Sequence, residues 1–207
     1  MRGDGNTEIL SNYMPAEAAQ IISGWINHYH CEFKITKNRN SKFGDYRPPY
    51  QGKGHRISVN HTLNPYAFLV TTVHEFAHLV TFNQWKNKVK PHGQEWKDTF
   101  KRMMLPFFAL NILPRDVESA LAKYLKNPAA SSCSDANLFI TLKKYDQEKK
   151  SDNVLISEIP ENHNFQISTG RVFKKLAKNR TRYRCIEINT GKIYLFSPLA
   201  EVLPLSG

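Results

Sequence analysis

Cysteine is scarce in this sequence. Its 207 residues include three cysteines, Cys31, Cys133 and Cys185, which lie far apart and form no C-x-x-C pair. An odd and scattered set argues against a disulfide framework and fits a reducing compartment. It also excludes a four-cysteine zinc site within one chain.

Long apolar runs are missing as well. The longest, such as 66–70 and 105–113, fall well below the ~18 residues that cross a bilayer. The first eight residues lack the apolar segment of a secretory signal. We therefore expect a cytoplasmic protein with no membrane partner, for which association with the nucleoid is an option.

Acidic residues are outnumbered by basic ones. Lys and Arg total 29 against 18 Asp and Glu, a formal net charge of +11. Apolar residues at 41% and charged residues at 23% are ordinary values, which excludes collagen-like, coiled-coil and wholly disordered chains. The length suits one domain or a main domain with a small appendage. The positive charge favours a polyanionic partner such as nucleic acid, and solubility is the alternative.

Hydrophobic periodicity predicts an α+β fold. Apolar residues at helical spacing indicate helices over about 15–30, 66–82, 92–104 and 114–125. Asn64-Pro65 is a start signal for the second helix, and Pro106 is expected to end the third. Short alternating runs at 33–35 and 57–59 indicate a small antiparallel sheet before the second helix.

The second half of the chain has a different composition. Residues 128–137 are small and polar, which is typical of a linker. Strand-like runs separated by turn signals follow at 171–173, 183–188 and 193–196. We expect a main domain over 1–127, a linker over 128–137 and a small basic β-rich C-terminal module over 138–207.

A metal-binding motif lies in the second predicted helix, where the sequence reads His74-Glu75-Phe76-Ala77-His78. Side chains four residues apart share one face of a helix, so His74 and His78 can hold one metal ion together, and two imidazoles suit zinc. The neighbouring Glu75 can act as general base towards a water at the metal. Most of the helix is apolar, so these polar groups need a cation or solvent to satisfy them.

A catalytic zinc site needs a third protein ligand. The metzincin continuation would require glycine and histidine at the positions of Thr81 and Gln84, which excludes that class. His92 is the favoured third ligand, because it lies one turn before Trp96 on an inward face. Glu95 is the competing candidate. Possible oxyanion donors are His55, His61 and Tyr66, and spacing does not choose among these three.

These residues carry a resemblance to a known family. His74-Glu75-x-x-His78, followed by Pro91-His92-Gly93-x-x-Trp96, resembles the SprT-like family of zinc metallopeptidases, relatives of the DNA-dependent protease Spartan. The resemblance covers roughly 21–125. It implies a zincin-like domain in which a short sheet packs on the HExxH helices, with Glu75 as general base and one Zn²⁺ held by His74, His78 and His92. It also implies proteolysis of DNA-associated or DNA-crosslinked proteins.

The tail departs from many members of that family. They end in a zinc ribbon built from paired cysteines, which this chain cannot form, so no second zinc is expected. The leading hypothesis is a zinc metalloendopeptidase acting on proteins at DNA. The alternatives are a nucleic-acid-associated binding protein with a structural or vestigial metal site, and a general cytosolic zinc peptidase.

Basic residues concentrate in two strips, 34–56 and 171–184, each interleaved with aromatic residues. Cations for phosphates and aromatics for stacking favour single-stranded nucleic acid, and a solvated face is the alternative for each strip. The candidate contacts are Arg39, Lys42, Arg47, Lys53, Arg56, Arg171, Lys174, Lys175, Lys178, Arg180, Arg182 and Arg184.

Overall fold

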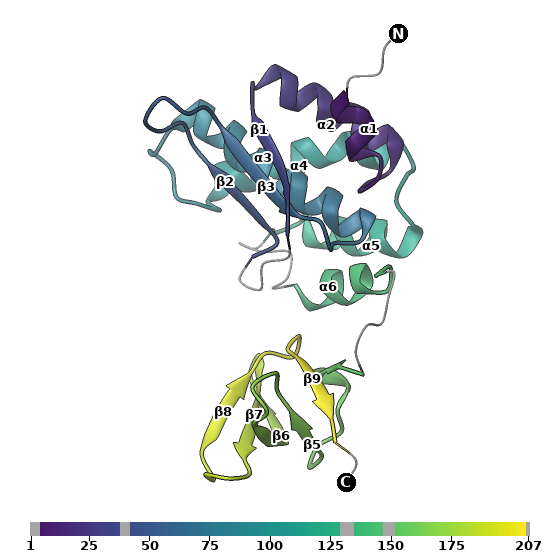
Figure 1. Cartoon of the computed structure of the whole chain (residues 1–207), viewed down its shortest axis with the longest axis vertical. Coiled ribbons are helices and arrows are strands. Elements are labelled where there is room, and N and C mark those ends of the chain that lie inside the picture. The colour runs from purple at the N-terminus through teal and green to yellow at the C-terminus, as the bar shows by residue number, and fades with distance from the viewer. Residues whose placement is uncertain (1–4, 38–41, 129–134, 147–151, 206–207) are drawn as a thin grey trace. The chain divides into compact units, whose positions relative to one another are not determined.

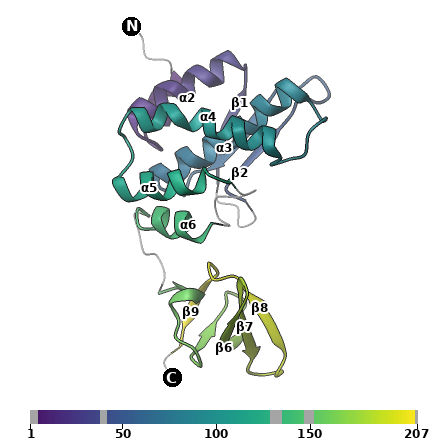
Figure 2. The same cartoon turned by 180° about the vertical axis from the view of Figure 1, so that it is seen from behind.

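The computed structural model describes residues 5–37, 42–128, 135–146 and 152–205 (Figures 1 and 2). The chain forms two compact units that divide between Gln147 and Glu148. The first unit combines helices with a three-stranded sheet, and the second is built on a six-stranded antiparallel sheet. The predicted α+β class is confirmed. Among these residues no helix is both long and apolar enough to span a membrane.

The first unit packs its helices against its sheet. The helices are α1 (Gly5–Leu10), α2 (Ala16–His28), α3 (Pro65–Trp85), α4 (Gln94–Ala109), α5 (Arg115–Tyr124) and α6 (Ala136–Lys143). The strands are β1 (Glu32–Thr36), β2 (Gly44–Arg47) and β3 (Arg56–Asn60).

The sheet is mixed, which corrects the expectation of an antiparallel one. Its strand order is β1-β3-β2, with β3 parallel to β1 and antiparallel to β2. β3 takes the centre because it carries the buried side chains of the sheet, Ile57, Val59 and Asn60, at 1%, 0% and 0% exposure. Alternation of apolar residues identifies a strand but does not decide which neighbour it pairs with. Because β3 is in the centre, β2 forms one edge of the sheet.

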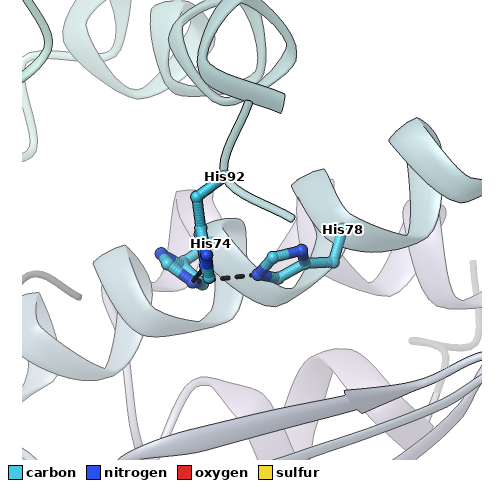
Figure 3. Close-up of side chains that lie close together, drawn as sticks. All are labelled: His74, His78 and His92. Carbon is cyan, nitrogen blue, oxygen red and sulfur yellow. Dashed lines mark hydrogen bonds between the residues drawn. The ribbon is translucent and has the colours of Figure 1, made fainter. Parts of the chain in front are cut away.

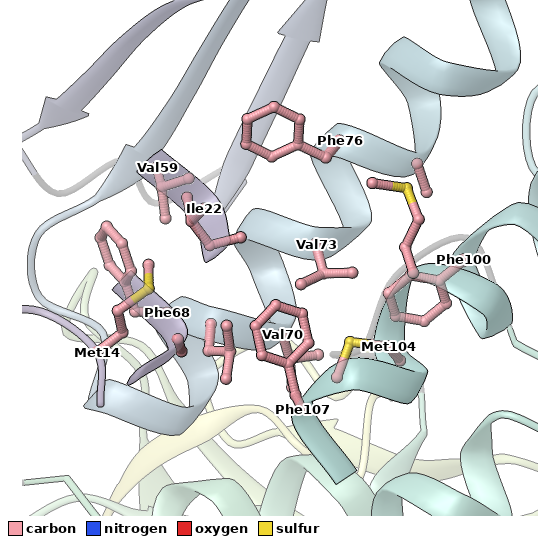
Figure 4. Packing of buried hydrophobic residues seen from close by; sticks show 14 of the residues in the cluster. Met14, Ile22, Val59, Phe68, Val70, Val73, Phe76, Phe100, Met104 and Phe107 are labelled. Carbon is pink, nitrogen blue, oxygen red and sulfur yellow. The ribbon is translucent and has the colours of Figure 1, made fainter. Parts of the chain in front are cut away.

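Helix α3 is the centre of the first unit and covers the helix predicted over about 66–82. Asn64 caps it by accepting hydrogen bonds from the backbone N–H groups of Tyr66 and Ala67, and Pro65 occupies the first helical position. Most of its residues from Ala67 to Thr81 are buried, so α3 is covered on nearly every side. Figure 4 shows Val70, Val73 and Phe76 of this helix amid side chains from other elements.

Helix α4 differs from its predicted bounds at both ends. It begins at Gln94, so His92 lies in the turn before it, and it continues through Pro106 to Ala109. Pro106 is exposed, so water can satisfy the carbonyl that lacks its helical donor. The fully buried Phe107 next to it contributes to the core only if the helical course continues.

Helix α6 lies in the region expected to belong to the linker and the C-terminal module. Most of the expected linker, residues 129–134, is outside the described residues. Leu138 and Leu142 of α6 belong to the core of the first unit, and the Asn64 side-chain amide donates to the Leu142 carbonyl at 2.8 Å. These contacts explain why the first unit extends to residue 147.

The second unit has a small core of its own. Its elements are β4 (Val154–Leu155), the 3-10 helix η2 (Ile156–Glu158), β5 (Asn164–Gln166), β6 (Val172–Asn179), β7 (Arg182–Glu187), β8 (Ile193–Phe196) and β9 (Glu201–Pro204). The strands follow the order β4-β9-β5-β6-β7-β8. Phe165, Phe173 and Cys185, each 0% exposed, lie in this core. The β-rich character of residues 152–205 agrees with the strand pattern of the sequence.

Candidate metal centre

Three histidines converge in the first unit (Figure 3). The Nε2 atom of His74 lies 3.2 Å from Nε2 of His78 and 3.3 Å from Nε2 of His92. One ligand atom from each residue lies within 4.8 Å of the other two, so the group can hold one metal ion. The structure thus brings together the three ligands favoured by the sequence.

Helix α3 presents two of these ligands because its period places residues four apart on one face. His74 is 9% exposed and His78 is half-buried. The helix is held on several sides by the core, so the two imidazoles are fixed relative to each other before any ion binds. Such preorganisation favours a defined metal geometry.

His92 reaches the pair from the turn that precedes α4. Its backbone has a φ of 57°, a left-handed conformation that is uncommon for residues other than glycine. The next residue, Gly93, is the N-cap of α4, and the Gly93 N–H donates to the Lys90 carbonyl. The tight turn therefore directs the imidazole towards α3. Strained backbone of this kind is often found at functional sites.

The electrostatics keep the three imidazoles neutral. Burial lowers the pKa of His74 well below its ordinary value of 6.5, with further lowering from the nearby His78 and His92. Burial and His92 lower the pKa of His78 to about 3, and burial also lowers the pKa of His92. Neutral imidazole is the form that binds a metal ion, so near neutral pH all three nitrogens are available as ligands.

An aromatic wall encloses the ligands on one side. The fully buried ring of Trp96 lies 4.6 Å from the ring of His74, 4.7 Å from that of His92 and 5.3 Å from that of His78, measured between centroids. Phe100 stacks on Trp96 at 5.2 Å. These rings fix the orientations of the imidazoles and exclude water from behind the site.

The other side of the group opens into a cleft of about 280 Å³. The cleft is lined by the three histidines, by Glu75 and by residues of the edge strand β2, namely Gly44, Asp45 and Tyr46. Three protein ligands with an open side are the arrangement of a catalytic zinc site, whereas structural zinc sites are closed by four protein ligands. Neutral imidazole nitrogens also suit zinc chemically, so the residues present fit such an ion.

Glu75 lies in the wall of this cleft and is 7% exposed. Its carboxylate meets the backbone of β2: a Cβ atom built on Gly44 would lie 2.5 Å from Oε1 of Glu75. The predicted base is therefore beside the ligands, in the same cavity.

No motif in the sequence marks Asp45 or Tyr46 as a residue of this site. Asp45 accepts from Lys42 Nζ at 2.7 Å and from Arg47 Nε at 2.9 Å. Burial raises the pKa of Asp45, but these two cations more than offset it, so the pKa is lowered. The ring of Tyr46 is parallel to that of His78 at 6.4 Å. Both residues belong to β2, and only the packing of β2 along α3 brings them to the cleft.

The other candidates are outside both the three-histidine group and the cleft lining. Glu95 is neither in the three-histidine group nor among the residues that line the cleft. None of the three proposed oxyanion donors lines the cleft. His55 lies 3.0 Å from the Tyr46 hydroxyl through its Nδ1, and Tyr66 packs against Tyr145.

The basic strips contain residues of different kinds. Arg171 is paired with Glu187 at 2.6 Å, and the 3%-exposed Lys175 donates to the Ile159 carbonyl, so both have roles inside the second unit. Phe173 is fully buried and cannot stack on a base. Arg39 lies outside the described residues, and Lys174 and Arg56 are half-buried. Besides Arg171, the exposed members are Lys42, Arg47, Lys53, Lys178, Arg180, Arg182 and Arg184.

The residues of this site lie in a region that matches a known protein family. Residues 16–116 match the SprT-like family, and this range includes α3, the three histidines and the edge strand β2. The chain therefore carries a SprT-like family domain over these residues. Comparisons with curated proteins and with solved structures gave no match. Fold, family and histidine spacing are together consistent with a zinc metallopeptidase site.

Proposed function

We propose that the protein is a zinc-dependent metalloendopeptidase. The observation that carries this proposal is the convergence of three neutral imidazoles on one side of an open cleft, with the Glu75 carboxylate in the wall of the same cleft. A structural metal site would need neither the open side nor the carboxylate.

The proposed chemistry divides between the ion and the chain. When bound by His74, His78 and His92, a zinc ion would supply a Lewis acid for water and for the peptide carbonyl. Glu75 accepts the proton of the attacking water and passes it to the amine nitrogen that leaves. The low exposure of Glu75 and the packing of β2 against it hold the carboxylate still.

The edge strand suggests how a substrate is held. β2 pairs with β3 on one side only, and no described strand pairs with its other edge. An extended peptide can add to such an edge through backbone hydrogen bonds. Since Gly44, Asp45 and Tyr46 of β2 line the cleft, a peptide bound in this way would pass the ligand group.

The enzyme assignment is tested with Glu75→Gln in the zinc-loaded protein, assayed on an unfolded protein substrate. The substitution keeps the size of the side chain but removes the base, so the zinc content should stay the same while cleavage is lost. The His78→Ala protein should lose both its zinc and its cleavage activity. Cleavage by the Glu75→Gln protein would contradict the mechanism, and metal binding without cleavage by the unaltered protein would favour a binding protein with a vestigial site.

We also propose that its substrates are presented on DNA, with single-stranded DNA favoured. Support comes from the net charge of +11 and from the exposed cations of the β6–β7 hairpin, Lys178, Arg180, Arg182 and Arg184. In the first unit, Tyr50 is 67% exposed and lies between the exposed Arg47 and Lys53, where an aromatic ring can stack on a base. This loop follows β2, the strand that lines the cleft.

DNA binding is tested with the triple variant Arg180→Ala, Arg182→Ala and Arg184→Ala. If these side chains contact phosphates, the slope of log affinity for single-stranded DNA against log salt should fall by about 0.7 per lost contact. The matched control replaces three exposed cations outside both strips, Arg115, Lys123 and Lys126, with alanine. Equal effects of both triple variants would contradict a specific surface, and a cleavage rate indifferent to DNA would indicate a general peptidase.

A further inference from the structure

We propose that Gly44 is the positioning residue for the Glu75 carboxylate. Its missing side chain lets the backbone of the edge strand pack directly on Glu75 and hold the carboxylate in the cleft wall. The kinetic part of this inference rests on the proposed function, whereas the packing part stands without it.

The space around Gly44 is already filled. A Cβ atom at this position would lie 2.5 Å from Oε1 of Glu75, 2.8 Å from its Cγ and 2.8 Å from Cγ2 of Thr71. Real Cβ atoms essentially never show contacts under 3.0 Å, because such distances lie well inside the optimal separation of about 3.5–4.0 Å between non-bonded atoms. Two of the three atoms belong to Glu75, so a side chain at position 44 and the present carboxylate position exclude each other.

Backbone conformation does not explain this glycine. Among the residues that the structure describes, the glycines with positive φ are Gly52, Gly170 and Gly191, and Gly44 is not one of them. Gly44 is the first residue of β2 and pairs with Val59 in the antiparallel register. The requirement for glycine therefore comes from the neighbouring α3 and not from the strand itself.

The strand cannot easily retreat from the helix at this point. The Asn60 backbone N–H donates to the Phe43 carbonyl at 2.9 Å, and the Asn60 side-chain amide donates to the Lys42 carbonyl at 3.0 Å. Asn60 is fully buried. Because β2 is anchored to β3 immediately before Gly44, an added methyl group would displace the Glu75 side chain sooner than the strand.

Thr71 completes the enclosure. It precedes Glu75 by one helical turn and is 5% exposed, so the Glu75 side chain has this neighbour on its own helix and the Gly44 backbone across from it. The carboxylate is thus held by packing from two elements. A displacement of about 1 Å of a catalytic group can lower the rate by about 100-fold.

The decisive experiment compares Gly44→Ala with Gly24→Ala. Gly24 is exposed on α2 and has nothing within 4 Å of its added methyl group, so it is the matched control. We expect Gly44→Ala to lower kcat on a protein substrate by about 100-fold, with zinc affinity unchanged. Gly24→Ala should change neither. The positioning role would be overturned if kcat of the Gly44→Ala protein were unchanged. It would also be overturned if zinc affinity fell by the same factor as kcat.

A thermal double-mutant cycle tests the packing without activity. Tm of the metal-free protein is measured for the unaltered chain, Gly44→Ala, Glu75→Ala and the double variant. Glu75→Ala removes the two closest atoms, so Gly44→Ala should lower Tm much less in that background. If Gly44→Ala fails to fold alone, the double variant should still fold. An equal drop in both backgrounds, relieved by Thr71→Ser instead, would overturn the inference. Absence of proteolysis by the unaltered protein would contradict the proposed function. The Tm cycle would still test the packing of Gly44 on Glu75.

Discussion

The Nε2 atoms of His92 and His74 lie 3.3 Å apart, although 18 positions separate the two residues in the chain. His74 is carried by α3, while His92 is in a turn with left-handed backbone outside any helix. The short distance depends on the turn that connects α3 to α4. The position of His92 therefore depends on tertiary structure, whereas His74 and His78 are brought together by the period of one helix.

Replacement of His92 should therefore disable metal binding. Loss of a second-shell partner alone typically costs 10–100-fold in metal affinity, so His92→Ala should weaken zinc binding by at least about 100-fold. Glu95→Gln is the control, because Glu95 is close in sequence but outside the ligand group. Competition against a chromophoric chelator measures both. A larger loss for Glu95→Gln than for His92→Ala would reverse the ligand assignment.

Trp96 should support both the fold and the site. It is fully buried and its ring lies within 5.3 Å of all three imidazole rings. Trp96→Ala should lower the free energy of unfolding by about 3–5 kcal/mol, as large-to-small changes in a core do, and should also weaken zinc binding. Trp96→Phe keeps an aromatic ring and should lose less of both. Urea unfolding of the metal-free protein separates the stability effect from the loss of metal.

Asn64 should link the metal helix to α6. Its side chain accepts from two backbone N–H groups of α3 and donates to the Leu142 carbonyl and to Asp146. Asn64→Ala should lower the free energy of unfolding by about 2–3 kcal/mol, from the lost cap and from buried groups left without partners. Asn64→Ser keeps a capping oxygen but loses the amide donor, so an intermediate value is expected. Equal stability of all three proteins in urea would contradict the link.

The second unit should lose stability in acid through Glu187. The Arg171 guanidinium, followed by the Thr190 hydroxyl, lowers the pKa of Glu187 from 4.5 to about 2. The folded chain holds this proton less tightly than the unfolded chain, so the stabilisation is complete above pH 4.5 and is lost as pH falls towards 2.

This acid sensitivity can be followed in the full chain through the amide NMR signals of β7 in urea. Above pH 4.5, the urea concentration at the unfolding midpoint of β7 should be lower in the Glu187→Gln protein than in the unaltered protein. Between pH 4.5 and 2, this midpoint should depend less on pH in the Glu187→Gln protein. An acid dependence that is the same in both proteins would assign it to other groups.

Much of the first unit could be predicted because its signals are local. Asn64-Pro65 marks the start of α3 through groups within the first turn, and helical periodicity of the apolar residues places the helices. The HExxH spacing acts over five residues. Each of these relations holds within a few residues of the chain, where backbone geometry alone decides which atoms meet.

The features that were not predicted depend on distant partners. The parallel pairing of β1 with β3, the membership of α6 in the first unit and the approach of Gly44 to Glu75 all join segments far apart in sequence. The same holds for Arg171 and Lys175, which read as free cations but are engaged inside the second unit.

The sequence by itself determined the ligand pair and its carboxylate, because the period of an α-helix places His74 and His78 on one face with Glu75 beside them. It also indicated His92. Only the tertiary structure decided how the site is closed and opened: Trp96 covers one side, and the edge strand β2 borders the other with Gly44, Asp45 and Tyr46. The reason is physical, since the position of β2 follows from its pairing with β3 and its packing on α3, which no local pattern contains.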